Sequence, residues 1–168
     1  MIKTLFPYFG SKKRVVKDVW SRFGKIENFI EPFAGSLAVL LGNPNIPKIE
    51  TINDKDTMVS NFWRASIAEP DKVAEYADYP VLESDLHARH RWLISSAADE
   101  LKHKINHDPF FYDTRVAGWW VCESSMARKI GQLGGLGIIH RMCSVAQQNQ
   151  LVLDSKNSLL SNIGFISK

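Results

Sequence analysis

Two short apolar segments, each followed by a turn, constrain the fold of this chain more than any other feature. Residues 26–31 have the composition of a strand that stops at Pro32, and the turn Pro32-Phe33-Ala34-Gly35 leads into a short apolar helix that Ser36 is expected to cap. Residues 48–52 form a second candidate strand, which ends in Asn53-Asp54. Helices are expected on both sides, over residues 11–22 with Ser11 as N-cap and from Asp56 or Thr57 to the residue before Pro70. This order predicts the opening of an α/β sheet with crossover connections.

Composition and charge narrow the class of protein. The 168 residues are 45% hydrophobic and 23% charged, which excludes collagen-like and disordered chains and indicates about one domain. No apolar stretch approaches the ~20 residues that span a bilayer, so we expect a cytoplasmic protein that does not contact membranes. The net charge of +3 combines a basic beginning, an acidic middle and a mildly basic end. The cluster Lys12-Lys13-Arg14 with Lys17 has two interpretations, a phosphate-contacting patch or a solvated helix face.

The rest of the chain is predicted to be mostly helical. Helices are expected over residues 71–77, 84–105 and 114–129, and a strand over residues 150–153. Beyond Gly131 the composition changes to Gly, Ser, Asn and Gln, which suggests that a shifted or divergent reading frame replaces the original continuation.

The first strand and the acid after the second strand predict a ligand site. A turn glycine exposes backbone N–H groups at a helix N-terminus, and an acid about 20 residues further on is suited to bind a ribose hydroxyl pair. Only Gly35 lies in the turn, so an adenosine ligand without a pyrophosphate, such as S-adenosylmethionine, suits Gly35 and Asp54 better than a dinucleotide. An ordinary strand–turn–helix with an exposed acid is the equally weighted alternative.

Three segments together resemble a known family. These are Pro7-Tyr8-Phe9-Gly10-Ser11-Lys12, then residues 29–36 (FIEPFAGS), then Asn53-Asp54-Lys55-Asp56 with Asn61-Phe62-Trp63. In this order and spacing they resemble, over residues 5–68, the N-terminal part of the D12 class (Dam-like) of N6-adenine-specific DNA methyltransferases. The resemblance implies a partial Rossmann-like sheet that binds S-adenosylmethionine, with a helical target-recognition insert. It divides the chain into a cofactor-binding part (1–70), a helical insert (71–130) and a divergent C-terminal segment (131–168).

The resemblance also implies roles for individual residues. Tyr8, Gly10 and Lys12 would line the methionine end of the cofactor. Glu31 and the turn residues Phe33, Ala34 and Gly35 would hold its amino acid part, and Asp54 would bind the ribose hydroxyls. Double-stranded DNA is the implied partner, in DNA methylation of the restriction–modification or phage type, and a second chain that completes the sheet is a further candidate partner.

The catalytic motif of such enzymes, Asp-Pro-Pro-Tyr after a hydrophobic strand, is not found. Asp108-Pro109-Phe110-Phe111 lacks the second proline and follows polar, helix-like residues, and residues 151–154 lack both prolines. We therefore assign no catalytic residue. The pairs His87–His90 and His103–His107 have helical spacings suited to zinc, but no acid or cysteine completes a set, so we expect no metal.

Three functional hypotheses remain. The first is a truncated DNA adenine-N6 methyltransferase, and the second is a non-catalytic S-adenosylmethionine- or DNA-binding remnant of such an enzyme. The third is a nucleotide-binding or helical DNA-interaction module without methyl-transfer ancestry.

Overall fold

A small parallel sheet organises the first half of the molecule. The computed structural model describes residues 4–45, 47–79, 82–130 and 163–165. In these residues β1 (Asn28–Glu31), β2 (Ile49–Ile52) and β3 (Ile163–Phe165) pair side by side in the order β1-β2-β3, and both pairings are parallel. Parallel pairing places the carboxyl ends of β1 and β2 at the same edge, so the turns that follow them are neighbours.

The predicted crossover between the first two strands is confirmed. After a 3₁₀ turn over Lys12–Arg14, helix α1 (Val16–Phe23) leads to β1, and helix α2 (Ala38–Leu41) connects β1 to β2. The two helices are joined where the indole Nε1 of Trp20 donates a 2.8 Å hydrogen bond to the carbonyl of Val39. The chain is thus an α/β protein over this part, as predicted.

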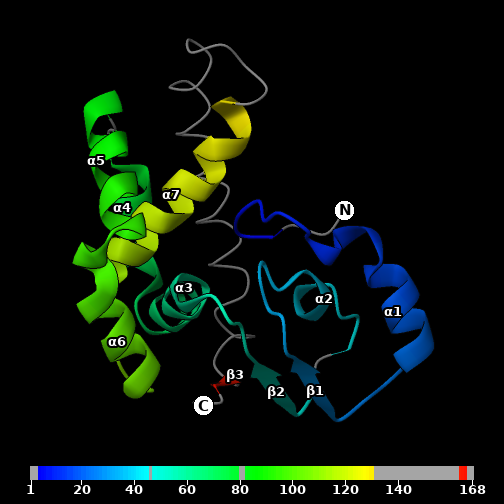
Figure 1. The fold of residues 1–168 in the computed structure, drawn as a ribbon. Coiled ribbons are helices and arrows are strands. Elements are labelled where there is room, and N and C mark those ends of the chain that lie inside the picture. Colours follow the sequence, from blue (N-terminus) through cyan, green and yellow to red (C-terminus); the bar gives the residue numbers. More distant parts are fainter. Residues whose placement is uncertain (1–3, 46, 80–81, 131–162, 166–168) are drawn as a thin grey trace.

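Helix α3 (Thr57–Ala68) lies between the sheet and the remaining helices (Figure 1). It begins where predicted, because the Asp56 carboxylate accepts a 2.9 Å hydrogen bond from the amide of Met58. Its apolar side chains join the main core, in which Phe62 and Trp63 are almost fully buried. The loop before α1 enters this core through Phe6, whose ring lies 4.9 Å from that of Phe62 and 5.1 Å from that of Trp120.

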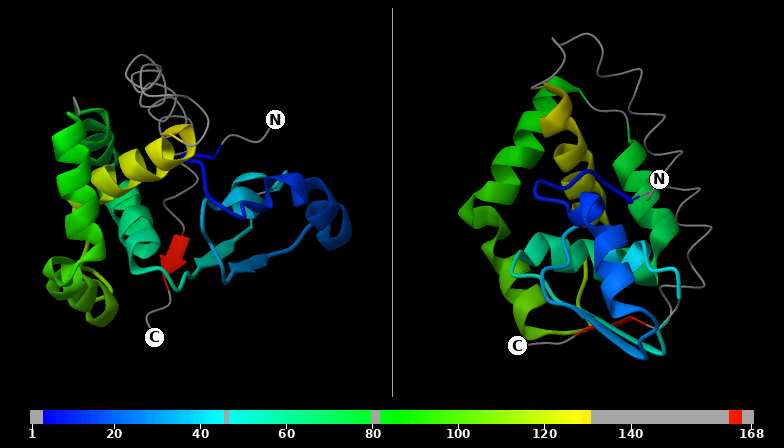
Figure 2. Two further views of the ribbon diagram at one scale, coloured as in Figure 1. Left: turned by 45° about the horizontal axis from the view of Figure 1, so that its top comes forward. Right: turned by 90° about the vertical axis from the view of Figure 1, so that its right-hand side faces the viewer.

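Four further helices form a bundle on the other side of α3 (Figure 2). They are α4 (Pro70–Asp78), α5 (Glu83–Ile94), α6 (Asp99–His107) and α7 (Thr114–Ile130), with a 3₁₀ turn over Ser96–Ala98. Helix α7 packs closely on α4 at Gly118, where a Cβ atom would lie only 2.5 Å from the Cβ of Tyr76. No helix in the described part of the chain is both long and apolar enough to cross a membrane.

Several sequence-based predictions need correction. Ser11 makes no capping hydrogen bond, and the α-helix begins only at Val16. Ser36 is buried and its hydroxyl lies 3.2 Å from that of Ser11, whereas Leu37, at φ 50°, is the residue before α2. The helix predicted over residues 84–105 is broken after Ile94, because the Ser95 hydroxyl accepts a hydrogen bond from the amide of Ala97 and starts a new turn.

Strand β3 was not predicted, since residues 163–165 (IGF) are too short to stand out as a periodic pattern. The strand predicted over residues 150–153 lies outside the described residues.

Candidate functional site

The turns after β1 and β2 are joined through a carboxylate. One oxygen of Asp54, Oδ2, accepts a 2.8 Å hydrogen bond from the amide of Gly35, and Oδ1 accepts a 2.9 Å hydrogen bond from the amide of Asp56. The amide of Ala34 also donates to the carbonyl of Asn53 (2.8 Å). The two candidate residues proposed from spacing, Gly35 and Asp54, are therefore in direct contact.

Gly35 is held by two aromatic side chains. It has φ +49°, a left-handed conformation that favours glycine, and a Cβ atom there would lie 2.8 Å from Cδ1 and Cε1 of Tyr8. Its carbonyl accepts a 2.8 Å hydrogen bond from the indole of Trp63. Burial raises the pKa of Tyr8, and the nearby carboxylates of Asp54 and Asp56 raise it further, so this phenol stays protonated. Tyr8 thus lies against the glycine of the turn.

Lys12, which is partly exposed, forms an ion pair with the buried carboxylate of Glu31. The ammonium Nζ lies 2.9 Å from Oε1 of Glu31, whose side chain is 3% exposed, and it also donates to the carbonyl of Phe33. The other oxygen, Oε2, accepts a hydrogen bond of 3.1 Å from the amide of Leu40. Burial raises the pKa of Glu31, although Lys12 and the helix amides oppose this shift. The pair anchors the 3₁₀ turn of Lys12 to the end of β1.

The remaining candidate residues differ in what they can offer to a ligand. Phe33 is 74% exposed, and nothing lies within 4 Å of the position where Gly10 would carry a Cβ atom, so both border open space. The side chain of Ala34 is buried and its amide is already bonded to Asn53, so this residue offers neither its methyl group nor its N–H.

The donors and acceptors of the turn retain capacity for a ligand such as S-adenosylmethionine. A carboxylate has about four acceptor sites, and Asp54 uses two of them within the described part of the chain. An ammonium has three donors, and Lys12 directs two of them at Glu31 and Phe33. The residues present therefore fit a ligand with a hydroxyl pair and a carboxylate.

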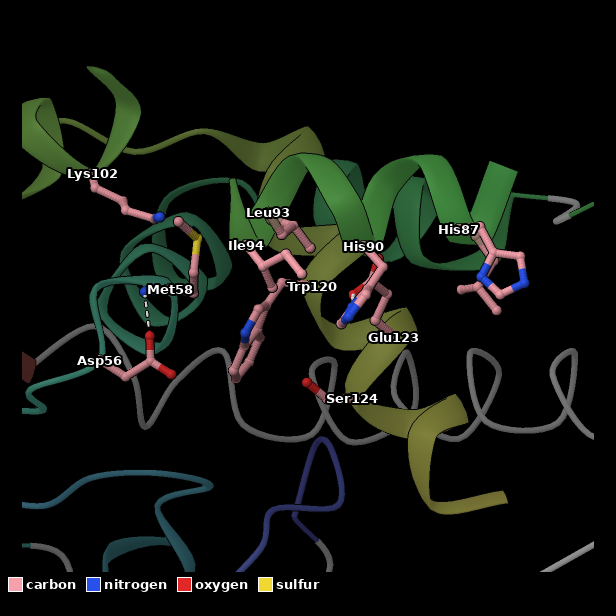
Figure 3. A pocket seen from close by; sticks show the side chains of 11 residues that line it. Asp56, Met58, His87, His90, Leu93, Ile94, Lys102, Trp120, Glu123 and Ser124 are labelled. Atoms are coloured by element: carbon pink, nitrogen blue, oxygen red, sulfur yellow. Dashed lines mark hydrogen bonds and ion pairs between the residues drawn. The ribbon is translucent and has the colours of Figure 1, made fainter. Parts of the chain in front are cut away.

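Enclosed space near the turn is unevenly distributed. The cavity lined by Asp54, Ser60 and Arg64 measures only about 20 Å³, far below the roughly 300 Å³ at which ligand pockets begin. A much larger cavity of about 570 Å³ lies among α3, α5, α6 and α7, and Asp56 lines its edge (Figure 3). Enclosed space of ligand size therefore lies among the helices and not at Asp54 itself.

The larger cavity contains a histidine–glutamate pair that spacing along the sequence does not predict. His90 Nδ1 lies 3.1 Å from Oε2 of Glu123, and the indole of Trp120 projects into the same space (Figure 3). Burial raises the pKa of Glu123, while His90 and then Arg89 oppose the shift. No sequence signal could have found this pair, because its members are 33 residues apart on two helices.

The Asp108-Pro109-Phe110-Phe111 string lies in a loop that follows helix α6. This confirms the prediction that no strand precedes it. The Asp108 carboxylate accepts a 2.9 Å hydrogen bond from the amide of Phe110, and Arg64 donates to the carbonyl of Asp108. Among the described residues, no group of three or more His, Cys, Asp or Glu side chains could hold a metal ion.

A glycine turn beside an acid at the carboxyl edge of a parallel sheet is the arrangement of nucleotide-binding α/β proteins. Comparison with known families narrows this broad class to one family, because a model of the D12 class N6 adenine-specific DNA methyltransferases matches residues 8–147. The chain belongs to this family. A curated relative, an inosine-5'-monophosphate dehydrogenase of Trypanosoma brucei brucei, is 48% identical over 48 residues. That match covers 29% of this chain and 9% of the relative, so it carries no inference about activity.

Proposed function

We propose that this chain binds S-adenosylmethionine as the methyl donor of a DNA methyltransferase specific for adenine N6. Membership of the D12 class supports a DNA methyltransferase. The observation that carries the donor assignment is the contact between Asp54 and Gly35, which places an acid and a left-handed glycine side by side where β1 and β2 end. The small parallel sheet that ends in these turns is consistent with a partial Rossmann-like sheet, and membership of the family supports double-stranded DNA as the substrate.

Each residue in or beside the turn has a specific task in this proposal. The free acceptor sites of Asp54 take the ribose hydroxyls, and the remaining donor of Lys12 takes the carboxylate of the methionine part. Tyr8 limits the approach to the turn, and its raised pKa keeps the phenol neutral beside two carboxylates. The exposed ring of Phe33 offers an apolar cover. When bound, the donor supplies an activated methyl group on a sulfonium sulfur.

The residues that would hold the target adenine amine are not found in this chain. The 168-residue sequence contains no Asp-Pro-Pro-Tyr string, and the nearest substitute follows a helix. A target amine must be held by hydrogen-bond acceptors in line with the methyl group. We therefore propose that this chain contributes donor binding and DNA contacts, and that a second chain supplies the strand with the acceptor residues.

The experiment has two arms. Titration calorimetry with S-adenosylmethionine should detect binding that Asp54→Ala abolishes and that Asp18→Ala, a change of an exposed acid on α1, leaves intact. Absence of binding to the wild type at millimolar donor would refute the proposal and favour a family member that does not bind the methyl donor.

The second arm incubates the chain and donor with plasmid DNA and scores protection from methylation-sensitive restriction enzymes. We expect no protection by this chain alone. Protection would contradict the proposal that this chain lacks the acceptor residues, and it would show that other residues of the chain hold the adenine amine.

A further inference from the structure

A second groove lies on the helical part of the molecule, away from the turn. It measures about 500 Å³ and runs between α5, α6 and the start of α7. Neighbouring tryptophans of α7 face different spaces, since Trp119 lines this groove and Trp120 lines the larger cavity of Figure 3. Three cationic side chains and three aromatic rings line the groove, namely Arg89, Lys104, Arg115, Trp92, Phe111 and Trp119.

The ring of Trp119 is contacted by two guanidinium groups. The Cζ atoms of Arg89 and Arg115 each lie 5.2 Å from its centroid, and Trp92 meets it edge-on at a centroid distance of 6.5 Å. Stacking against an indole orients a guanidinium group without using its N–H donors. Two oriented guanidinium groups, with their N–H donors, are thus available to a ligand at one wall of the groove.

The acids of the groove are already engaged. Glu100 lies 2.7 Å from the ammonium of Lys104, and Asp113 Oδ1 accepts a 2.8 Å hydrogen bond from the amide of Val116 at the start of α7. Neither Arg89 nor Arg115 has an ion-pair partner among the described residues, in contrast to Lys104.

Arg89 in particular has a donor without a partner. Its Nη1 atom is buried and makes no hydrogen bond within the described part of the chain. Glu123 feels its charge, because Arg89 helps to lower the pKa of that carboxyl, yet no hydrogen bond joins the two among the described residues. Oε2 of Glu123 is bonded to His90, and its Oε1 is likewise buried without a hydrogen-bond partner in this part of the chain. A buried cationic donor left unpaired costs free energy, which an anionic ligand would recover.

We propose that this groove binds phosphodiester groups of the DNA backbone, with Arg89 and Arg115 as the phosphate-contacting residues. Guanidinium forks match phosphate geometry in pairs of hydrogen bonds, and the DNA backbone presents phosphates in series. This assignment rests on the proposed function for its choice of DNA as the source of phosphate. It adds to that function a specific contact surface on the helical part.

The test measures binding of a fluorescently labelled 14-base-pair duplex by anisotropy, without methyl donor, across a salt series. Arg89→Gln/Arg115→Gln should weaken binding about tenfold near 50 mM salt and lower the slope of log affinity against log salt by about two, because two phosphate contacts are lost. The matched control is Arg22→Gln/Arg91→Gln, which removes the same charge from exposed positions on α1 and α5 and should change affinity much less. Arg89→Lys/Arg115→Lys, which keeps the charge, should give an intermediate loss.

Several outcomes would overturn the proposal. The wild type could fail to bind the duplex, the groove and control variants could lose equal affinity, or the groove variant could bind the duplex as the wild type does. Calorimetry with deoxyadenosine monophosphate separates the two phosphate sources. Micromolar binding that the groove variant abolishes, with duplex affinity unchanged, would assign the groove to free nucleotides. Because the assay contains no donor, failure of methyl transfer leaves this result unaffected, and the groove variant should bind S-adenosylmethionine like the wild type.

Discussion

The carboxylate of Asp54 accepts a 2.8 Å hydrogen bond from the backbone amide of Gly35, 19 residues earlier in the chain. This bond connects the turn after β1 to the turn after β2. Its strength depends on charge, because a carboxylate acceptor makes hydrogen bonds roughly twice as strong as a neutral one. Asp54 therefore has a structural task as well as the proposed task of binding ribose hydroxyls.

The two tasks of Asp54 can be separated by Asp54→Asn. The amide retains one acceptor oxygen, so one of the two backbone N–H groups loses its partner, and we expect a loss of about 1–2 kcal/mol in the free energy of unfolding. Binding of S-adenosylmethionine should fall at least tenfold, because the charged acceptor is gone. Urea denaturation and calorimetry measure the two effects. Asp18→Asn on α1 is the control, and unaltered donor binding by Asp54→Asn would remove Asp54 from the site.

Gly35→Ala should destabilise the turn through both backbone and side chain. A left-handed conformation costs a non-glycine residue roughly 1–2 kcal/mol, and the added Cβ meets the Tyr8 ring at 2.8 Å. Thermal unfolding of Gly35→Ala, Tyr8→Ala and the double variant forms a double-mutant cycle. We expect the double variant to recover the steric part of the loss but not the backbone part. Strict additivity would mean that the two residues do not press on each other.

Glu31 should make the stability depend on pH in a direction set by its raised pKa. The folded state binds the proton more tightly than the unfolded state, whose pKa is near 4.5, so the contribution of Glu31 to stability is complete below that pH. It declines as the pH rises through the folded pKa.

The measurement compares wild type with Glu31→Gln by urea denaturation between pH 4 and pH 8. The variant should gain stability relative to the wild type as the pH rises through this window, since other titrating groups cancel in the comparison. A difference that is constant with pH, or that changes in the opposite direction, would contradict the raised pKa.

Asn61 should be essential for the attachment of α7 to α3. Its side chain is fully buried, and it both donates to the carbonyl of Asp113 (2.9 Å) and accepts from the Asp113 amide (2.8 Å). Asn61→Ala leaves both backbone groups without that partner, so we expect a loss of about 2–4 kcal/mol. Asn106→Ala, which removes an exposed amide, is the control for denaturation experiments. Equal stability of the two variants would show that the backbone groups find other partners.

Local patterns predicted the elements that have clear local signals. The composition of the residues before Pro32 and Asn53 predicts both strands, and a capping residue at Asp56 or Thr57 predicts the start of α3. The break at Ser95 was missed because the apolar periodicity continues across it, whereas the backbone follows a local hydrogen bond to the Ser95 hydroxyl. Ser36 was misassigned because its burial next to Ser11 depends on a contact 25 residues away.

The sequence by itself determined the order of the first two strands and their turns, the three motifs of the family and the pairing of a turn glycine with a later acid. These features depend on local conformational preferences and on spacing along the chain. Only the tertiary structure decided that Lys12 meets Glu31, that Tyr8 covers Gly35, and that Arg89 and Arg115 stack on Trp119. The physical reason is that these contacts join residues on separate elements, and their energies arise from burial and charge that exist only once the elements are packed.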